Sequence, residues 1–186
     1  MSEIATTPFD ILQQAQSGDM VQVGALYEHY HLGVYRYLFY LLGDQHLAED
    51  LTSEVFLRMI RSLPQYRLQG ASFRAWLYRI ARNLAVDHIR KVKQYQQVSV
   101  EENLPAAMFD PLSQVEQELD SERLKLCLAQ LSSEQREVVI LRFVVGLPIS
   151  EVANALNKSL DAIKGLQRRG LTALRAMLID LEVENE

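Results

Sequence analysis

The sequence of 186 residues is poor in cysteine, proline and glycine, with one, five and eight of each. A single thiol, Cys127, excludes an intramolecular disulfide framework and a zinc site built from several cysteines. So little glycine and proline excludes a collagen-like or broadly disordered chain. No apolar run approaches the roughly 18 residues of a membrane-spanning helix, and no basic residue precedes Arg36 as in a signal peptide. We therefore predict a cytoplasmic protein without membrane insertion.

Patterns typical of enzymes are also missing from the sequence. It has no glycine-rich phosphate loop and no nucleophile elbow. The four histidines, at positions 29, 31, 46 and 88, lack the spacing of metal ligands, and a helix would place the first two on different faces. We therefore expect no catalytic residue, no metal site and no cofactor.

Charge is unevenly distributed along the chain, although its net value is only −5. Residues 61–100 hold eight basic and one acidic side chain, whereas residues 1–60 hold two basic and eight acidic, and residues 101–130 hold two and seven. A basic segment between two acidic ones predicts one surface that meets phosphate. A solvated helical face without a ligand is the alternative from charge alone.

Apolar residues recur at three- and four-residue steps, as in Val23, Leu26 and Tyr30, and no alternating run predicts a strand. The pattern stops between residues 94 and 110, where glutamine, glutamate and proline gather. It resumes with a stripe that includes Cys127, which we expect to be a buried core thiol. The predicted fold class is all-α. Two small helical domains, residues 17–95 and 112–181, are joined by a flexible acidic and polar linker, residues 96–111.

Capping and breaking residues predict where helices begin and end. Gly43 is expected to end one helix and Asp44 to cap the next, which stops before Pro64. Residues 65–71 are expected to form a loop, and Ser72 then caps a long helix.

The C-terminal part has the spacing of a helix-turn-helix. A helix over residues 134–145 is followed by a short one over residues 148–156, a tight turn, and a last helix capped by Ser159. A plain helical hairpin has a similar pattern and is the alternative. In a helix-turn-helix the last helix enters the major groove, and its outward polar side chains would be Lys158, Asp161, Lys164, Gln167, Arg168 and Arg169.

Three segments together resemble a known family. They are residues 48–58 (AEDLTSEVFLR), residues 73–90 (FRAWLYRIARNLAVDHIR) and residues 131–138 (LSSEQREV) with the helix-turn-helix after them. In order and spacing they are similar to bacterial extracytoplasmic-function (ECF, group IV) sigma factors, over residues 17–95 and 112–178. The resemblance implies a non-catalytic subunit that binds core RNA polymerase, directs it to promoter DNA and melts the minus-ten element without ATP.

The resemblance also implies roles for residues of the first domain. Contacts with the β′ clamp helices of the polymerase would come from Asp50, Leu51, Glu54 and Phe56. Contacts with the minus-ten element would come from Tyr66, Arg67, Arg79, Arg82, Asn83, Arg90 and Lys93. The loop over residues 65–72 would cradle a flipped base with Asn83 reading its edge. Trp76 has the period of a core residue rather than of a wedge, and Asp87 would orient neighbouring arginines.

In the second domain the resemblance places minus-thirty-five contacts at Lys158, Ser159, Lys164, Gly165, Arg168 and Arg169. The sequence departs from the commonest form of the family, because Gly165 replaces a serine, Leu166 an arginine and Pro148 a capping serine. One phosphate or base contact of the family pattern with the minus-thirty-five element is therefore missing. The resemblance further implies contact with the β flap, a linker in the RNA exit channel and control by an anti-sigma factor.

A stand-alone transcription regulator is the second hypothesis, because residues 134–174 also resemble output domains of the LuxR type. The first domain argues against it, since nothing there resembles a phosphoacceptor or ligand-binding module. We therefore predict that the protein is a sigma factor.

Overall fold

The computed structural model describes residues 8–67, 72–96 and 115–183, and every regular element in these ranges is helical. The all-α prediction is confirmed. The first group of helices is α1 (Pro8–Gln16), α2 (Met20–Leu42), α3 (Gln45–Ser62), the short 3-10 turn η1 (Leu63–Gln65) and α4 (Phe73–Gln96). The second group is α5 (Val115–Gln130), α6 (Ser133–Val139), the π-helical turn η2 (Ile140–Val144), α7 (Ile149–Leu156) and α8 (Leu160–Val183). Most of the predicted linker, residues 96–111, lies outside the described residues.

Side-chain caps begin the helices of the first group where the sequence predicts. The Asp44 carboxylate accepts a hydrogen bond from the Leu47 amide at 2.9 Å, and Gly43 ends α2 with φ of 76°. The Ser72 hydroxyl accepts one from the Ala75 amide at 3.1 Å at the start of α4. These bonds satisfy amides that have no partner within their own helix, which explains why the chain starts each helix there.

The second group contains the predicted helix-turn-helix. Ser132 caps α6 in a reciprocal pair with Gln135, and the Ser159 hydroxyl accepts a hydrogen bond from the Ala162 amide at 3.2 Å to cap α8. Between α7 and α8 the chain turns through Asn157, whose φ of 52° lies in the left-handed region that asparagine tolerates. The sequence did not predict that α6 continues as the π turn η2.

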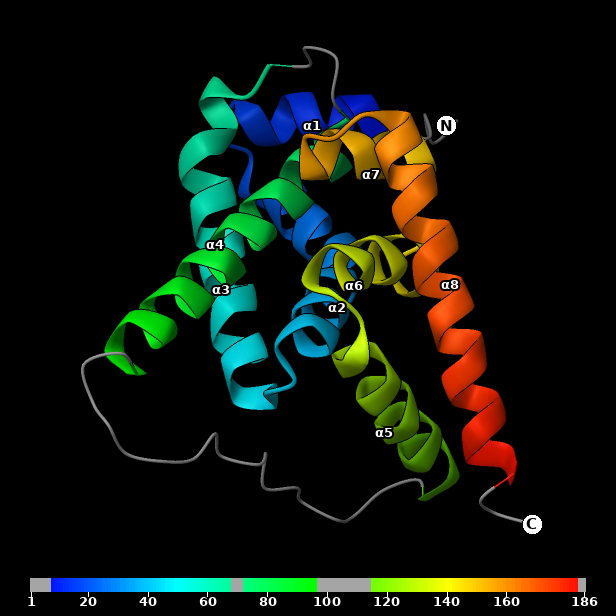
Figure 1. Cartoon of the computed structure of the whole chain (residues 1–186). Coiled ribbons are helices and arrows are strands. Elements are labelled where there is room, and N and C mark those ends of the chain that lie inside the picture. Colours follow the sequence, from blue (N-terminus) through cyan, green and yellow to red (C-terminus); the bar gives the residue numbers. More distant parts are fainter. Residues whose placement is uncertain (1–7, 68–71, 97–114, 184–186) are drawn as a thin grey trace.

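The two groups of helices pack against each other. In the structure α4 lies along α7, and α2 contacts both η2 and α5 (Figure 1). The buried apolar side chains form one continuous cluster that runs through both groups, with Tyr37, Leu77 and Ile163 each fully buried. Cys127, 1% exposed, belongs to this cluster, as its position on the apolar stripe predicts. The linker therefore joins two helical groups that also share a surface.

Candidate nucleic-acid interface

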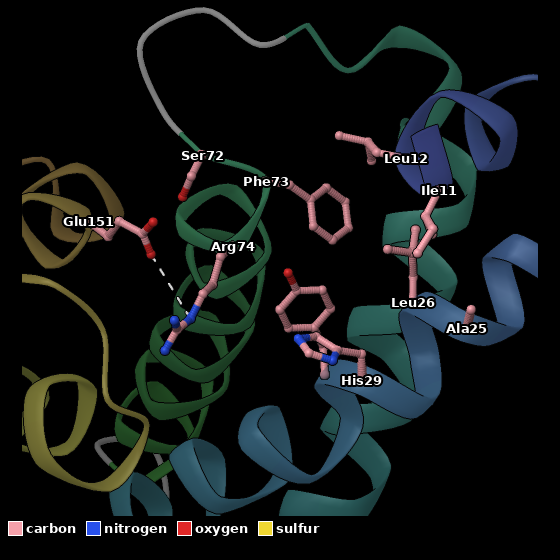
Figure 2. Close-up of a pocket in the computed structure, with 10 residues that line it drawn as sticks. Ile11, Leu12, Ala25, Leu26, His29, Ser72, Phe73, Arg74 and Glu151 are labelled. Atoms are coloured by element: carbon pink, nitrogen blue, oxygen red, sulfur yellow. Dashed lines mark ion pairs between the residues drawn. The ribbon is translucent and has the colours of Figure 1, made fainter. Parts of the chain in front are cut away.

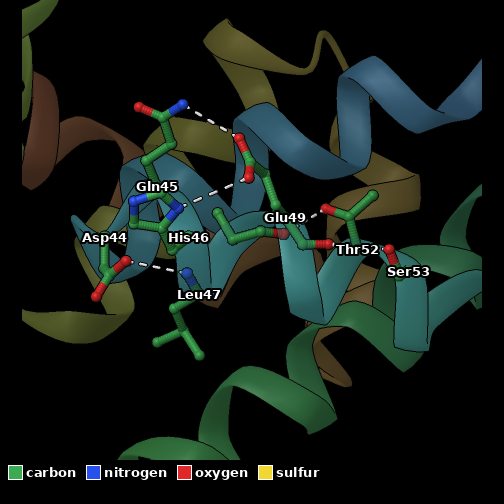
Figure 3. A network of polar contacts seen from close by, with 8 residues as sticks. Asp44, Gln45, His46, Leu47, Glu49, Thr52 and Ser53 are labelled. Carbon is green, nitrogen blue, oxygen red and sulfur yellow. Dashed lines mark hydrogen bonds and ion pairs between the residues drawn. The ribbon is translucent and has the colours of Figure 1, made fainter. Parts of the chain in front are cut away.

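The N-terminal half of α3 carries an acidic, exposed surface on a well-ordered polar network. Gln45 donates to Glu49 at 3.1 Å, and the Thr52 hydroxyl donates to the Ala48 carbonyl at 2.6 Å. Figure 3 shows Gln45 and Glu49 joined by this contact, with Thr52 further along the helix. Asp50 is exposed beside this network and Glu54 is half-buried. The Glu54 carboxylate accepts a hydrogen bond from Arg58 at 2.7 Å. This surface offers negative charge to a partner.

The apolar part of this α3 surface differs from the sequence-based assignment. Phe56 is 4% exposed, and its ring packs edge-on against Tyr27 with centroids 4.8 Å apart. Leu51 is half-buried. The exposed apolar side chain beside the acidic residues is Leu57, at 48%. One residue step turns a helix by about 100°, so Leu57, seven residues after Asp50 and three after Glu54, lies on their face of the helix, whereas Phe56 points to the core.

The segment before α4 holds an aromatic cluster. The ring of Tyr66 lies 4.7 Å from Trp76 and 5.8 Å from Phe73 between centroids, and burial raises the pKa of the Tyr66 hydroxyl. Trp76 is thus a partly buried packing residue, as its period predicts. Arg67 is exposed and donates to the backbone carbonyls of Pro64 and Tyr66. Of the predicted base-cradling loop, residues 68–71 lie outside the described residues.

One contact that holds this segment was missed at the sequence level. The Gln16 side chain, at the end of α1, donates to the Leu63 carbonyl at 3.2 Å and to the Tyr66 carbonyl at 2.8 Å. The partners are 47 and 50 residues away in sequence, so no local signal points to them. Gln16 thereby ties α1 to the start of the predicted base-binding loop.

The second half of α4 carries exposed residues of the basic segment. Asn83 and Arg90 are both exposed, and Arg90 donates to Asp87 at 2.7 Å, which is the orienting role expected for Asp87. Lys93 belongs to α4, and its side chain lies outside the described part of the structure. An exposed amide and an exposed guanidinium group, seven residues apart on one helix, suit the edges of unpaired bases and the phosphates between them.

Two other predicted DNA-binding arginines of α4 face the second helical group. Arg79 donates to the carbonyl of Asn154 in α7 at 2.5 Å, and Arg82 donates to the Glu137 carboxylate in α6 at 3.2 Å. Glu137 is 5% exposed, and its burial raises the pKa of its carboxyl even though Arg82 acts in the opposite direction. The structure therefore separates the predicted minus-ten residues into an exposed set and a set that contacts α6 and α7.

The start of α8 presents the predicted minus-thirty-five residues. Lys164 and Arg168 are exposed, and Lys164 pairs with Asp161 at 3.3 Å. Ser159 caps the helix, and Lys158 donates to Glu134 at 2.6 Å, which lowers the pKa of that carboxyl through the hydrogen bond.

The α8 surface at Gly165 is covered by one side chain of the same helix. A Cβ on this residue would lie 3.4 Å from Nη1 of the exposed Arg169, which folds back over it. Leu166 is 6% exposed and belongs to the core, so this position is used for packing where the family commonly has an arginine. Gln167 accepts a hydrogen bond from Arg142 at 3.2 Å. Because an arginine only donates, this bond uses one of the two acceptor sites of the Gln167 amide oxygen and orients the side chain.

Comparison with known proteins identifies the two helical groups. Residues 26–95 match the family Sigma-70 region 2, and residues 127–176 match Sigma-70, region 4. Among curated proteins the chain is 38% identical over 173 residues to the ECF RNA polymerase sigma factor BldN of Streptomyces coelicolor. This chain belongs to the ECF sigma factor family. The alignment with BldN covers 92% of this chain and 66% of BldN.

One further relative supports the assignment, and one solved structure shares the fold. The sigma factor is 35% identical over 160 residues to the ECF RNA polymerase sigma factor SigX of Bacillus subtilis, covering 81% of this chain and 80% of SigX. The solved sigma factor RpoE in complex with the anti-sigma factor NepR from Bartonella quintana has the same fold, with a TM-score of 0.74 at 22% identity, covering 83% of this chain and 95% of that one. The match to region 2 argues against the stand-alone regulator, because that hypothesis does not explain why residues 26–95 resemble a sigma factor domain.

Membership of this family makes the protein a sigma factor, which directs RNA polymerase to promoters. Within the described ranges, no helix is long and apolar enough to cross a membrane. The same residues contain no group of three or more histidine, cysteine, aspartate or glutamate side chains placed to hold a metal ion.

Proposed function

We propose that this ECF sigma factor binds core polymerase through α3, reads the minus-ten element with α4 and contacts the minus-thirty-five element with α8. The observation that carries the proposal is the exposed row on α4, where Asn83 and Arg90 stand beside Asp87 within the region 2 match. Melting then draws on the binding of unstacked bases by this row, and no ATP is needed.

The α3 surface supports docking on the β′ clamp helices. Asp50 is exposed, and Glu54 lies one turn further along the helix. Leu57, which lies between Glu54 and the end of α3, adds an exposed apolar side chain to this surface. Long-range attraction to a basic partner steers the encounter, and the apolar contact then holds it. Leu51 and Phe56 support this surface from beneath.

The α8 surface supports a contact with the minus-thirty-five element that is mainly to phosphate. Lys164 and Arg168 are exposed cations on the helix that follows the turn, while Leu166 is buried. Phosphate contacts fix the position of a protein on DNA without reading its sequence. We therefore expect promoter choice to depend more on the minus-ten element. The same domain contacts the β flap in this proposal.

Control by an anti-sigma factor is part of the proposal. The solved structure of similar fold holds its sigma factor together with the anti-sigma factor NepR. In this chain the second half of α4 and the start of α6 line a groove of about 740 Å³, with the exposed apolar side chains Val86 and Ile89 among its walls. Such a groove suits an amphipathic helix of a protein partner.

The experiment is transcription of fragmented genomic DNA by sigma-free core polymerase, with and without the protein. Discrete new start sites that share an upstream sequence would support the proposal, and their absence despite binding to core polymerase would contradict it. Asp50→Arg should abolish copurification with core polymerase. The matched control is Glu28→Arg, which makes the same charge change at an exposed position on α2. Equal copurification of the two variants would remove α3 as the docking surface.

A further inference from the structure

The segment that follows α3 is held by one glutamine of α1. The Gln16 side-chain amide donates from Nε2 to the Leu63 carbonyl at 3.2 Å and to the Tyr66 carbonyl at 2.8 Å. Both carbonyls lie at the end of α3 and η1, where a helix leaves carbonyl groups without partners of its own. Gln16 therefore caps the end of a helix that lies far from it in the sequence.

The Tyr66 carbonyl also accepts a hydrogen bond from Arg67. Nη1 of this exposed arginine donates to the Tyr66 carbonyl at 3.1 Å and to the Pro64 carbonyl at 3.2 Å. A guanidinium group has five donors in a rigid plane, so two carbonyls that bind one of its nitrogens restrict the direction of the other donors. The orientation of Arg67 thus depends on backbone carbonyls, one of which Gln16 holds in place.

Apolar contacts alone leave room for this segment to move against α1. Figure 2 shows Ile11 and Leu12 of α1 beside a cavity of about 420 Å³, which Phe73 also lines. The ring of Phe73 packs on that of Tyr66, with centroids 5.8 Å apart. A side chain beside a cavity lacks neighbours on one side and can shift toward it. Gln16 supplies directional bonds, which these apolar side chains cannot form.

We propose that Gln16 is a positioning residue for minus-ten recognition, because it holds the Tyr66 carbonyl and thereby sets the orientation in which Arg67 meets the promoter strand. This inference rests on the proposed function, with Arg67 among the contacts to the minus-ten element. It extends that function to α1, which precedes the region 2 match over residues 26–95. Gln16 acts through Arg67 and not through a DNA contact of its own.

The variant that tests the proposal is Gln16→Met. Methionine keeps the length of the side chain and a similar helix propensity but removes both donors. The fold should survive, because each carbonyl has a second donor: the Tyr66 amide donates to Leu63 at 3.1 Å, and Arg67 donates to Tyr66. Gln13→Met makes the same change at an exposed position of the same helix and is the matched control.

The first measurement follows the segment in the full-length protein without DNA. Trp76 is the single tryptophan of the chain, and its ring lies 4.7 Å from that of Tyr66 between centroids. Gln16→Met should shift the fluorescence emission of Trp76 to longer wavelength and increase its quenching by acrylamide, whereas Gln13→Met should leave both unchanged. Unchanged emission and quenching in Gln16→Met would show that Gln16 does not hold the segment, and would overturn the proposal.

The second measurement is a double-mutant cycle for DNA binding. The probe is a fluorescent single strand with the nontemplate minus-ten sequence of a promoter found in the transcription assay. Arg67→Ala should weaken binding by about two- to tenfold, which is the cost of one hydrogen bond. Gln16→Met should weaken it by up to the same factor alone, but by nothing further when Arg67→Ala is already present, because the two residues act as one unit.

A third substitution separates positioning from a general loss of folded protein. Gln16→Met combined with Arg90→Ala should multiply the two separate losses, because Arg90 lies on α4 and does not contact the segment that Gln16 holds. A loss from Gln16→Met that is equal in the unchanged, Arg67→Ala and Arg90→Ala proteins would overturn the positioning role.

The same data separate this inference from the proposed function. Weaker binding by Arg90→Ala together with unchanged binding by Arg67→Ala would overturn the inference and leave the role of α4 intact. Coupling between Gln16 and Arg67 together with unchanged binding by Arg90→Ala would support the inference and contradict the proposed role of the α4 row. If no promoter is found, the proposed function fails, and the inference fails with it.

Discussion

Replacing Gly165 by serine is expected to stabilise α8 and to strengthen its contact with the minus-thirty-five element. Gly165 lies in the second turn of α8, where a Cβ would come 3.4 Å from Nη1 of Arg169. That distance is an ordinary van der Waals contact with the mobile end of a long side chain. Both serine and alanine therefore fit at position 165 without moving the backbone.

The size of each effect follows from helix propensity and hydrogen bonding. Glycine in a helix interior costs about 1 kcal/mol relative to alanine, and serine costs about half as much. Gly165→Ala should raise the melting temperature by about 2–4 °C for a chain of 186 residues, and Gly165→Ser by about half of that. The serine hydroxyl adds a hydrogen bond to DNA worth about 0.5–1.5 kcal/mol, which is about a two- to tenfold gain in affinity.

Alanine and serine at position 165 separate the two effects. Thermal unfolding followed by circular dichroism measures stability, and fluorescence anisotropy with a duplex that carries the minus-thirty-five element measures affinity. Alanine stabilises the helix more but offers no hydroxyl, so only serine should tighten DNA binding. Equal gains in affinity for both variants would refute the hydroxyl contact. A lower melting temperature in both would show that the Arg169 side chain does not move aside.

Three further predictions concern packing, DNA contact and charge. Gly33→Ala places a Cβ 2.5 Å from the Tyr78 hydroxyl and should lower the free energy of unfolding by about 1–3 kcal/mol, so an unchanged urea midpoint would contradict the packing of α2 on α4. Arg168→Ala should weaken binding to duplexes with a minus-thirty-five element by about 1–3 kcal/mol, whereas an equal loss on duplexes without it would indicate a general phosphate contact. Burial raises the pKa of the Glu137 carboxyl, so its contribution to stability is complete at low pH and is lost as the pH rises through that raised pKa. Glutamine resembles the protonated acid, so Glu137→Gln should raise the melting temperature at neutral pH and flatten its pH dependence, and a lower melting temperature would show that the ion pair with Arg82 dominates.

Helix boundaries and the buried stripes could be predicted because their causes are local. Asp44, Ser72 and Ser159 each accept a hydrogen bond from the amide three residues ahead, so residue type and position are enough to predict these caps. The helix-turn-helix followed from the spacing of apolar residues, and Ile163 is fully buried as that spacing requires. Leu166 departs from the family pattern, and its side chain is buried in the core, where a leucine packs and a charged side chain does not.

Contacts between distant segments could not be predicted in this way. Arg82 and Glu137 are 55 residues apart, and Arg79 and Asn154 are 75 residues apart, so the spacing within either helix is unchanged whether or not they meet. From sequence, Arg79 and Arg82 belonged with the exposed Asn83. The sequence shows that a residue is an arginine and therefore charged. Which acceptor the arginine donates to depends on how the other domain packs against it.

The basic segment of the chain therefore has two parts with different uses. Its first part, with Arg74, Arg79 and Arg82, donates to groups of region 4, while Asn83 and Arg90 remain exposed. A charge count along the sequence weights these residues equally, although Arg61, Arg67 and Arg90 are exposed while Arg74, Arg79 and Arg82 donate to groups of region 4. The charge that the basic segment presents at the surface therefore depends on domain packing as well as on residue identity.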